Sequence, residues 1–137
     1  MSIQAGTYSL RSVLDPTIFV GTGAVPAIYP PYPAPLRSIE AAYKDAINIQ
    51  PTTGGYYVLK AHGQFIGYNG TDVKLLPLGG TAVEWAIVEV NGTDVYRLEL
   101  PNQGKWWMTS GVKYTTIQLV DDDESLSEEW SILPYKF

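Results

Sequence analysis

The feature that most constrains the fold is a short apolar pattern that occurs three times when the chain is read as a circle. Each copy has an apolar anchor residue in one strand-like unit and a tyrosine in the next. The anchors are Ile47, Trp85 and Trp130, and the tyrosines are Tyr57, Tyr96 and Tyr8. The third copy starts near the C-terminus and is completed at the N-terminus. A repeat of roughly 40–50 residues indicates an architecture built from three similar units.

Length and composition fit a single globular domain over residues 1–137. The chain is 45% hydrophobic and 17% charged, which is typical of a chain that buries a core. It has no cysteine, which excludes disulfides and thiolate metal ligands. We expect no cofactor and no metal site, and we expect a monomer.

Charge and hydropathy argue against two classes of partner. The net charge is -5 with 9 basic residues and no basic cluster, whereas a nucleic-acid partner requires a basic footprint. No apolar run approaches the roughly 20 residues that span a bilayer, so no membrane partner is expected. Residues 1–6 lack the basic and apolar regions of a signal peptide, so a cytoplasmic location is expected.

Most of the chain reads as short strands separated by turn residues. The predicted strands are 7–13, 18–20, 25–29, 47–49, 56–61, 64–68, 73–76, 83–90, 95–100, 105–108, 114–120 and 129–133. The pairs Asn69-Gly70 and Asn91-Gly92 predict two-residue type I′ turns. Ser38 to Lys44 is predicted to wind into about one and a half helical turns, with Ser38 as the cap.

Twelve short strands in three sets of four predict an all-β chain with a β-trefoil fold. A β-trefoil is a six-stranded barrel closed at one end by three hairpins, and a closed barrel leaves no exposed sheet edge. Because Ile47 is smaller than Trp85 and Trp130, Tyr43 or Phe19 is expected to fill the space beside it. A β-sandwich is the alternative, but a sandwich does not require a threefold repeat.

Several motifs resemble those of the mushroom β-trefoil protease inhibitors of the cospin type. They are Gly6-Thr7-Tyr8-Ser9-Leu10-Arg11, Phe19-Val20-Gly21, and the two Glu-Trp-x-Ile units at Glu84 and Glu129. More distantly, the chain is similar to the mycocypins and the fungal ricin-type lectins. The resemblance implies a small fungal cytoplasmic protein that blocks a serine protease, usually of trypsin type, with one exposed loop between its second and third strands. The equivalent segment here is Gly21-Thr22-Gly23-Ala24, which is short and has no basic residue.

A proline-rich segment is the main candidate for a protease-binding loop. Pro35, Leu36, Arg37, Ser38 and Ile39 follow closely spaced prolines, which stiffen the backbone. A stiff loop lowers the entropic cost of binding. The positive Arg37 would enter the acidic specificity pocket of a trypsin-like serine protease, and Ser38 would follow the scissile bond. The alternative is that this segment packs across the barrel with Arg37 as a solvated charge.

Other loops and another function stay open. Thr22, Gly23 and Ala24 form one alternative loop, and Asn69 and Gly70 form another, which would suit a cysteine protease of the legumain kind. Lys105-Trp106 and Lys113-Tyr114 look like strand positions.

A carbohydrate-binding lectin is the other class of function. Trp106-Trp107, with Asn102 and Gln103, could supply its aromatic platform. The Gln-x-Trp signature of ricin-type lectins is absent around Trp85 and Trp130.

The sequence offers no sign of an enzyme. Its one histidine, His62, lies in a predicted turn, and no nucleophile-elbow motif is present. The acidic run 121–124 lacks the alternating spacing and central glycine of an EF-hand loop. It is interpreted as a solvated hairpin loop.

Overall fold

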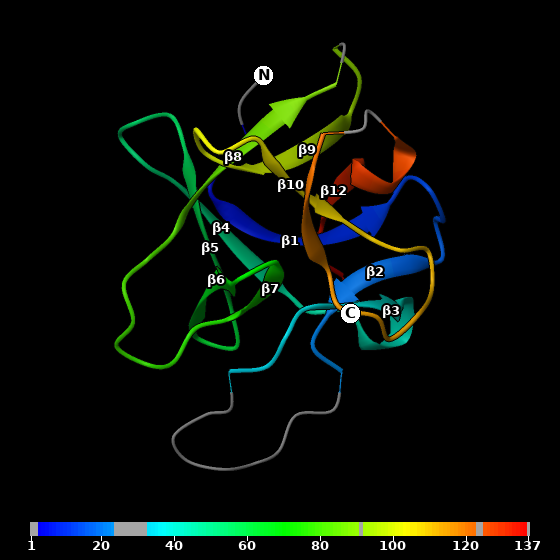
Figure 1. The fold of residues 1–137 in the computed structure, drawn as a ribbon, viewed down its shortest axis with the longest axis horizontal. Coiled ribbons are helices and arrows are strands. Elements are labelled where there is room, and N and C mark those ends of the chain that lie inside the picture. Colours follow the sequence, from blue (N-terminus) through cyan, green and yellow to red (C-terminus); the bar gives the residue numbers. More distant parts are fainter. Residues whose placement is uncertain (1–2, 24–32, 91, 123–124, 137) are drawn as a thin grey trace.

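The computed structural model describes residues 3–23, 33–90, 92–122 and 125–136 (Figure 1). Within them the chain forms twelve strands and two short 3₁₀ helices. The strands are β1 (Gly6–Ser12), β2 (Ile18–Gly21), β3 (Arg37–Glu40), β4 (Ile47–Pro51), β5 (Tyr57–Ala61), β6 (Gln64–Asn69), β7 (Asp72–Leu75), β8 (Glu84–Glu89), β9 (Val95–Leu100), β10 (Lys105–Met108), β11 (Gln118–Asp121) and β12 (Trp130–Pro134). The 3₁₀ helices are η1 (Ala41–Tyr43) and η2 (Leu126–Glu128). The strand predicted at 25–29 lies outside the described residues.

Six of the strands close into a barrel. Going round the ring, β1 pairs with β4, β4 with β5, β5 with β8, β8 with β9, β9 with β12, and β12 again with β1, all antiparallel. The other six strands form three hairpins, β2–β3, β6–β7 and β10–β11. The closed ring explains how an antiparallel chain of this size avoids exposed barrel edges. None of the helices in the described part of the chain is long and apolar enough to cross a bilayer.

A cyclic set of backbone hydrogen bonds joins the three hairpins. The N–H of Leu36 donates to the carbonyl of Val73 at 2.9 Å, Val73 donates to Ile117 at 3.0 Å, and Ile117 donates to Leu36 at 2.8 Å. All three side chains are fully buried. These three residues are therefore equivalent under an approximate threefold symmetry, and we call them the hairpin triangle.

A second ring of bonds surrounds the hairpin triangle with the same symmetry. Each of these bonds runs from the residue two positions after one triangle residue to the residue two positions before another triangle residue. The bonds run from Leu75 to Ala34 at 2.9 Å, from Leu119 to Thr71 at 2.7 Å and from Ser38 to Thr115 at 2.9 Å. The two rings bind the hairpins together, so the predicted threefold architecture is visible in the backbone itself.

The predicted anchors lie in the core. Ile47, Trp85 and Trp130 are fully buried, and Tyr57 and Tyr96 are also buried. The indole N–H of Trp85 donates to the carbonyl of Ile66 at 3.0 Å, and that of Trp130 donates to the carbonyl of Trp107 at 3.3 Å. Each anchor indole thus reaches from the barrel to a hairpin strand, which fixes the hairpin to the barrel.

Of the two residues expected to fill space beside Ile47, Tyr43 does not do so, and Phe19 is only partly buried. Tyr43 is 61% exposed, so it is not part of the core. The core instead contains a further buried tryptophan, Trp107 of β10, whose ring packs edge-on against Trp85 at a centroid distance of 5.3 Å. Edge-to-face packing of this kind adds about 0.5–1.5 kcal/mol beyond the area that it buries.

Two local predictions were wrong. Residues 37–40 form β3 and only 41–43 are helical, because the backbone of residues 37–40 pairs with β2 along its whole length. The type I′ turn expected at Asn69-Gly70 is also shifted, since Asn69 pairs with Asp72 and only Gly70 has a positive φ, of 63°. The pair with positive φ at both positions is His62 (55°) and Gly63 (74°). Position 91 lies outside the described residues.

Candidate functional site

The segment predicted to be the exposed protease-binding loop lies inside the fold. Leu36, Ser38 and Ile39 are buried, whereas Pro35 and Arg37 are partly exposed. Arg37 pairs with Gly21 and also forms a bridge with Thr116. The expectation of an exposed loop at residues 35–39 is therefore wrong. The physical reason is that the hairpin triangle and strand pairing use the backbone groups that a protease would need to bind.

The alternative loop at Thr22 and Gly23 starts at a polar cluster of two buried residues, Thr22 and Asp45, and the exposed His62. Thr22 is 1% exposed and its N–H donates to Asp45 Oδ2 at 3.0 Å. His62 Nε2 lies 3.0 Å from Asp45 Oδ1 and 3.3 Å from Thr22 Oγ1. In a catalytic triad the two ring nitrogens of histidine have separate partners. Here one nitrogen contacts both groups, so this is a structural cluster that holds the end of β2. Ala24 lies outside the described residues.

The Asn69 loop is a short exposed hairpin turn. Asn69 ends β6, and both Asn69 and Gly70 are exposed. Thr71 Oγ1 donates to Gln118 Oε1 at 2.9 Å, which ties this turn to β11. The turn remains accessible, but its ends are held in a strand pair.

The tryptophan platform expected for a lectin is not present as predicted. Trp107 is fully buried, and Trp106 is only partly exposed. The guanidinium of Arg97 lies over the Trp106 ring, 4.2 Å from its centroid. Asn102 and Gln103 are exposed in the turn before β10, where Asn102 has a φ of 65°. Because Arg97 covers one ring face and Trp107 faces the core, these two tryptophans do not form a joint exposed surface.

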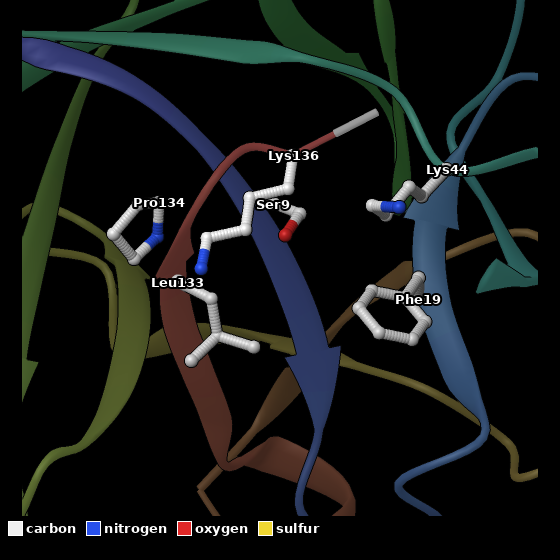
Figure 2. Close-up of a pocket in the computed structure, with 6 residues that line it drawn as sticks. All are labelled: Ser9, Phe19, Lys44, Leu133, Pro134 and Lys136. Atoms are coloured by element: carbon white, nitrogen blue, oxygen red, sulfur yellow. The ribbon is translucent and has the colours of Figure 1, made fainter.

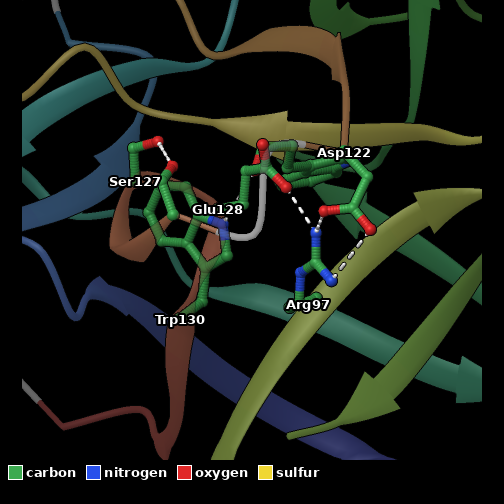
Figure 3. A network of polar contacts seen from close by, with 7 residues as sticks. Arg97, Asp122, Ser127, Glu128 and Trp130 are labelled. Carbon is green, nitrogen blue, oxygen red and sulfur yellow. Dashed lines mark hydrogen bonds and ion pairs between the residues drawn. The ribbon is translucent and has the colours of Figure 1, made fainter.

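Arg97 is held by two carboxylates (Figure 3). It donates to Asp122 at 2.5 Å and also to Glu128, whose side chain is fully buried. Burial acts to lower the pKa of Arg97, but the bonds to Asp122 and Glu128 outweigh it and raise the pKa above its ordinary value. The positive charge is therefore neutralised within the protein, which marks this network as structural.

The structure reveals an exposed loop that the sequence interpretation missed. Lys113-Tyr114 was expected to be strand, but β11 begins only at Gln118, and the two residues lie in the connection between β10 and β11. Val112 is 60% exposed, Tyr114 is 56% exposed, and Lys113 is also exposed. The alternation of residues 114–120 gave a strand-like signal, while Gly111 was the only local sign of a turn.

Side-chain hydroxyls brace this loop from within. Thr109 Oγ1 accepts the N–H of Gly111 at 3.1 Å, and Ser110 Oγ accepts the N–H of Val112 at 3.2 Å. Thr115 Oγ1 donates to the carbonyl of Val112 at 2.6 Å. These bonds satisfy backbone groups at the loop tip without a strand partner. The loop is therefore held in one shape while its tip projects into solvent.

Beside the loop, two tyrosines flank a shallow hollow of about 320 Å³. Tyr43 and Tyr114 stand at its sides, and Gly23 and Ile39 complete the lining. The hydroxyl of Tyr114 donates to Glu40 Oε1, and this bond raises the pKa of Tyr114. Tyr114 also has a φ of 71°, a conformation that is strained for a residue with a side chain. We refer to this feature as the tyrosine hollow.

No further chemistry is evident around these sites. Among the residues that the structure describes, no group of three histidine, aspartate or glutamate side chains is placed to hold a metal ion. The tyrosine hollow and the β10–β11 loop share Tyr114, so they form one continuous region. What this region offers is exposed aromatic surface, one carboxylate and one exposed ammonium group.

No protein family and no curated protein matches the chain in sequence. Solved structures do match it in shape. A proteinase inhibitor from Coprinopsis cinerea is 14% identical, with a TM-score of 0.81 over 98% of this chain and 100% of the inhibitor. The lactose-bound ricin B-like lectin of Macrolepiota procera is 17% identical, with a TM-score of 0.74 over 98% of this chain and 99% of the lectin. The Rhizoctonia solani agglutinin is 16% identical, with a TM-score of 0.75 over 98% and 99%.

The chain has a β-trefoil fold. The six-stranded barrel, the three hairpins and the hairpin triangle agree with this assignment, and the likeness extends over the whole chain. At these identities the likeness shows the fold alone. This β-trefoil therefore shares its architecture with an inhibitor and with lectins.

Proposed function

We propose that this β-trefoil is a protease inhibitor that acts on a trypsin-like serine protease through the β10–β11 loop. The observation that carries the proposal is the position of Lys113, an exposed basic residue at the tip of a loop that is braced by hydroxyl groups. The whole-chain likeness to the Coprinopsis proteinase inhibitor supports the class of function. We also propose a monomeric, cytoplasmic protein.

The approximate threefold symmetry relates the β10–β11 loop to the β2–β3 loop, which the cospin resemblance favours as the protease-binding loop. The hairpin triangle makes Leu36 equivalent to Ile117, so the β10–β11 connection corresponds to the β2–β3 connection. Between Thr22 and Leu36 the β2–β3 connection has no Lys or Arg. A trypsin-like target, which binds a basic residue in an acidic pocket, is therefore better matched by Lys113.

Binding requires the loop tip to extend. Lys113 and Tyr114 lie in a turn, and the N–H of Tyr114 donates to the Ser38 carbonyl at 2.5 Å. Releasing that bond costs about 0.5–1.5 kcal/mol. Extension also releases the strain of the positive φ at Tyr114, which is worth about 1–3 kcal/mol. Extension also breaks the Thr115 bond to the Val112 carbonyl, so contacts with the protease have to offset the cost of opening the turn.

A charge-reversal pair tests the proposal. We expect the purified protein to inhibit trypsin and Lys113→Glu to abolish inhibition, because a second negative charge in the acidic pocket costs several kcal/mol. Arg37→Glu serves as the matched control and should inhibit as the parent does, since its backbone is held in β3. If Arg37→Glu alone loses inhibition, the proline-rich segment is the reactive site and the proposal is wrong.

The choice of proteases completes this test. A parent protein that leaves trypsin-like enzymes untouched would refute the trypsin proposal. Including a legumain-type cysteine protease, with Asn69→Gln as the variant, tests the exposed Asn69 turn in the same experiment. Far-UV circular dichroism of each variant shows whether it is folded.

The tyrosine hollow favours carbohydrate binding as a second candidate function. Tyr43 and Tyr114 offer aromatic faces, and the Glu40 carboxylate can accept hydrogen bonds from sugar hydroxyls. A glycan array with the parent protein and with Tyr43→Ala tests this candidate. Leu78→Ala is a suitable control, because Leu78 is a 50% exposed apolar residue on a different loop. Glycan binding that survives Tyr43→Ala would place the sugar elsewhere.

A further inference from the structure

A separate groove lies on the outer surface of the barrel, away from the β10–β11 loop. It is about 290 Å³ in volume and is bordered by β1, β2, the residue that follows η1, and the end of β12 (Figure 2). Its lining residues are Ser9, Phe19, Lys44, Leu133, Pro134 and Lys136. This volume is just below the range for drug-sized ligand sites, roughly 300–1,000 Å³, so the groove suits a small ligand.

The walls of the groove are apolar, and its floor carries one hydroxyl. Phe19 stands on one side and Leu133 with Pro134 on the other, while the hydroxyl oxygen of Ser9 points into the space between them (Figure 2). Strand register places the floor beside one wall, because Ser9 lies opposite Leu133 in the β1–β12 pair. The groove thus combines apolar surface with a single hydrogen-bonding group at its base.

Two ammonium groups flank these apolar walls. Lys44 Nζ lies 5.7 Å from the centroid of Phe19 and 5.5 Å from that of Tyr135, and it donates to the Ala41 carbonyl at 3.4 Å. Lys44 is therefore held in place before any ligand arrives. Lys136 is exposed on the opposite side of the groove (Figure 2).

Neither ammonium group is neutralised by a carboxylate within the part of the chain that the structure describes. The acidic residue next to Lys44 in sequence, Asp45, bonds to Thr22 and His62 instead. This local positive charge contrasts with the net charge of -5 of the whole chain. Positive groups beside an apolar cleft attract a ligand that is both apolar and anionic.

We propose that this groove binds a small amphiphilic anion, namely a carboxylate or sulfonate carried on an alkyl or aromatic body. The apolar body packs between Phe19 and Leu133. Its acidic group accepts hydrogen bonds from Lys44 or Lys136, and the Ser9 hydroxyl is available as a further donor. This site is independent of protease inhibition, since it shares no residue with the β10–β11 loop.

The probe for the experiment is anilinonaphthalene sulfonate, an aromatic anion whose fluorescence rises in apolar surroundings. We expect a saturable fluorescence increase with the folded parent protein, and displacement of the probe by octanoate but not by the neutral octanol. Lys44→Gln and Lys136→Gln should each weaken binding roughly two- to fivefold, the range for a partly exposed charge pair. Added salt should weaken binding in the same direction.

A matched lysine makes the variant test specific. Lys60 also lies over an aromatic ring, 5.0 Å from the centroid of Phe65, but it is not part of the groove. Lys60→Gln should therefore bind the probe as the parent does. Absence of saturable binding, equal displacement by octanol, or an equal loss in Lys60→Gln would each overturn the proposal. The octanoate and octanol measurements use the parent protein, so the test does not depend on any variant folding.

Discussion

The backbone N–H of Asp45 donates to the carbonyl of Val20 at 3.1 Å, and it does so at the position where a tryptophan indole donates in the other two repeats. The carbonyls of Ile66 and Trp107 accept from the indoles of Trp85 and Trp130. The three accepting residues are equivalent by symmetry. Each pairs across its hairpin with a residue that donates in the second ring of backbone bonds: Val20 with Ser38, Ile66 with Leu75, and Trp107 with Leu119.

The Asp45 N–H takes the place of an indole N–H, which explains why the anchor of the first repeat can be aliphatic. Ile47 has no side-chain donor, so a tryptophan-type bond is not available to the Val20 carbonyl. A buried carbonyl without a partner would cost about 1–3 kcal/mol. The chain avoids that cost by bending after η1 so that Asp45 donates instead.

The anchor bonds lead to a prediction about tryptophan truncation. Trp85→Ala should lower the free energy of unfolding by about 3–5 kcal/mol, the range for large buried aromatic residues. Trp85→Phe keeps much of the ring but leaves the Ile66 carbonyl unbonded, so we expect a loss of about 1–3 kcal/mol. Urea unfolding measures both. A loss under about 1 kcal/mol for Trp85→Ala would show that Trp85 is not a core anchor.

The hairpin triangle predicts that Leu36, which follows the closely spaced prolines, contributes to the stability of the fold. Leu36→Ala should destabilise the protein by about 2–5 kcal/mol, because Leu36 is fully buried where the three hairpins meet. Leu78→Ala is the control for the same chemical change at a half-exposed position and should cost less than about 0.5 kcal/mol. Equal melting midpoints for the two variants would contradict the structure.

The buried ion pair predicts an unequal response to single and double substitution. Arg97→Met leaves the Glu128 carboxylate buried without its partner, and we expect a loss of about 3–5 kcal/mol. Adding Glu128→Gln removes the buried charge and should recover part of that loss. Chemical unfolding of the two variants gives the comparison. Equal stability of the single and double variants would mean that Glu128 does not depend on Arg97.

The lowered pKa of Asp15 predicts that the stability of the folded protein falls at acidic pH. A side-chain bond from Thr17, at 2.7 Å, and a backbone bond from the same residue lower the pKa of Asp15 below 3.8. Since the folded-state pKa is the lower one, the resulting stabilisation is present above 3.8 and is lost as the pH falls through the folded-state pKa. NMR titration of Asp15 should show a raised pKa in Thr17→Val. An unchanged pKa in that variant would exclude the hydroxyl as the cause.

The sequence by itself determined the repeat and the hydrophobic anchors. Trp85, Trp130 and Ile47 were predicted to be core residues from their recurrence, and they are buried. Most strand positions also followed from apolar alternation, because the side-chain period of a strand is written directly into neighbouring residues. The His62-Gly63 turn was expected between two strands for the same local reason.

Only the tertiary structure decided which segments are loops and which are buried. Residues 36–39 were interpreted as part of an exposed loop and residues 113–114 as strand positions, yet the first segment is enclosed by the hairpins and the second is an exposed loop. The difference arises from backbone hydrogen bonds between segments that are far apart in the chain, such as Leu36 to Val73. The same limit applies to Trp107, whose burial depends on its contact with Trp85 in another repeat. Backbone groups are chemically alike at every residue, so no local pattern records which distant partner they will meet.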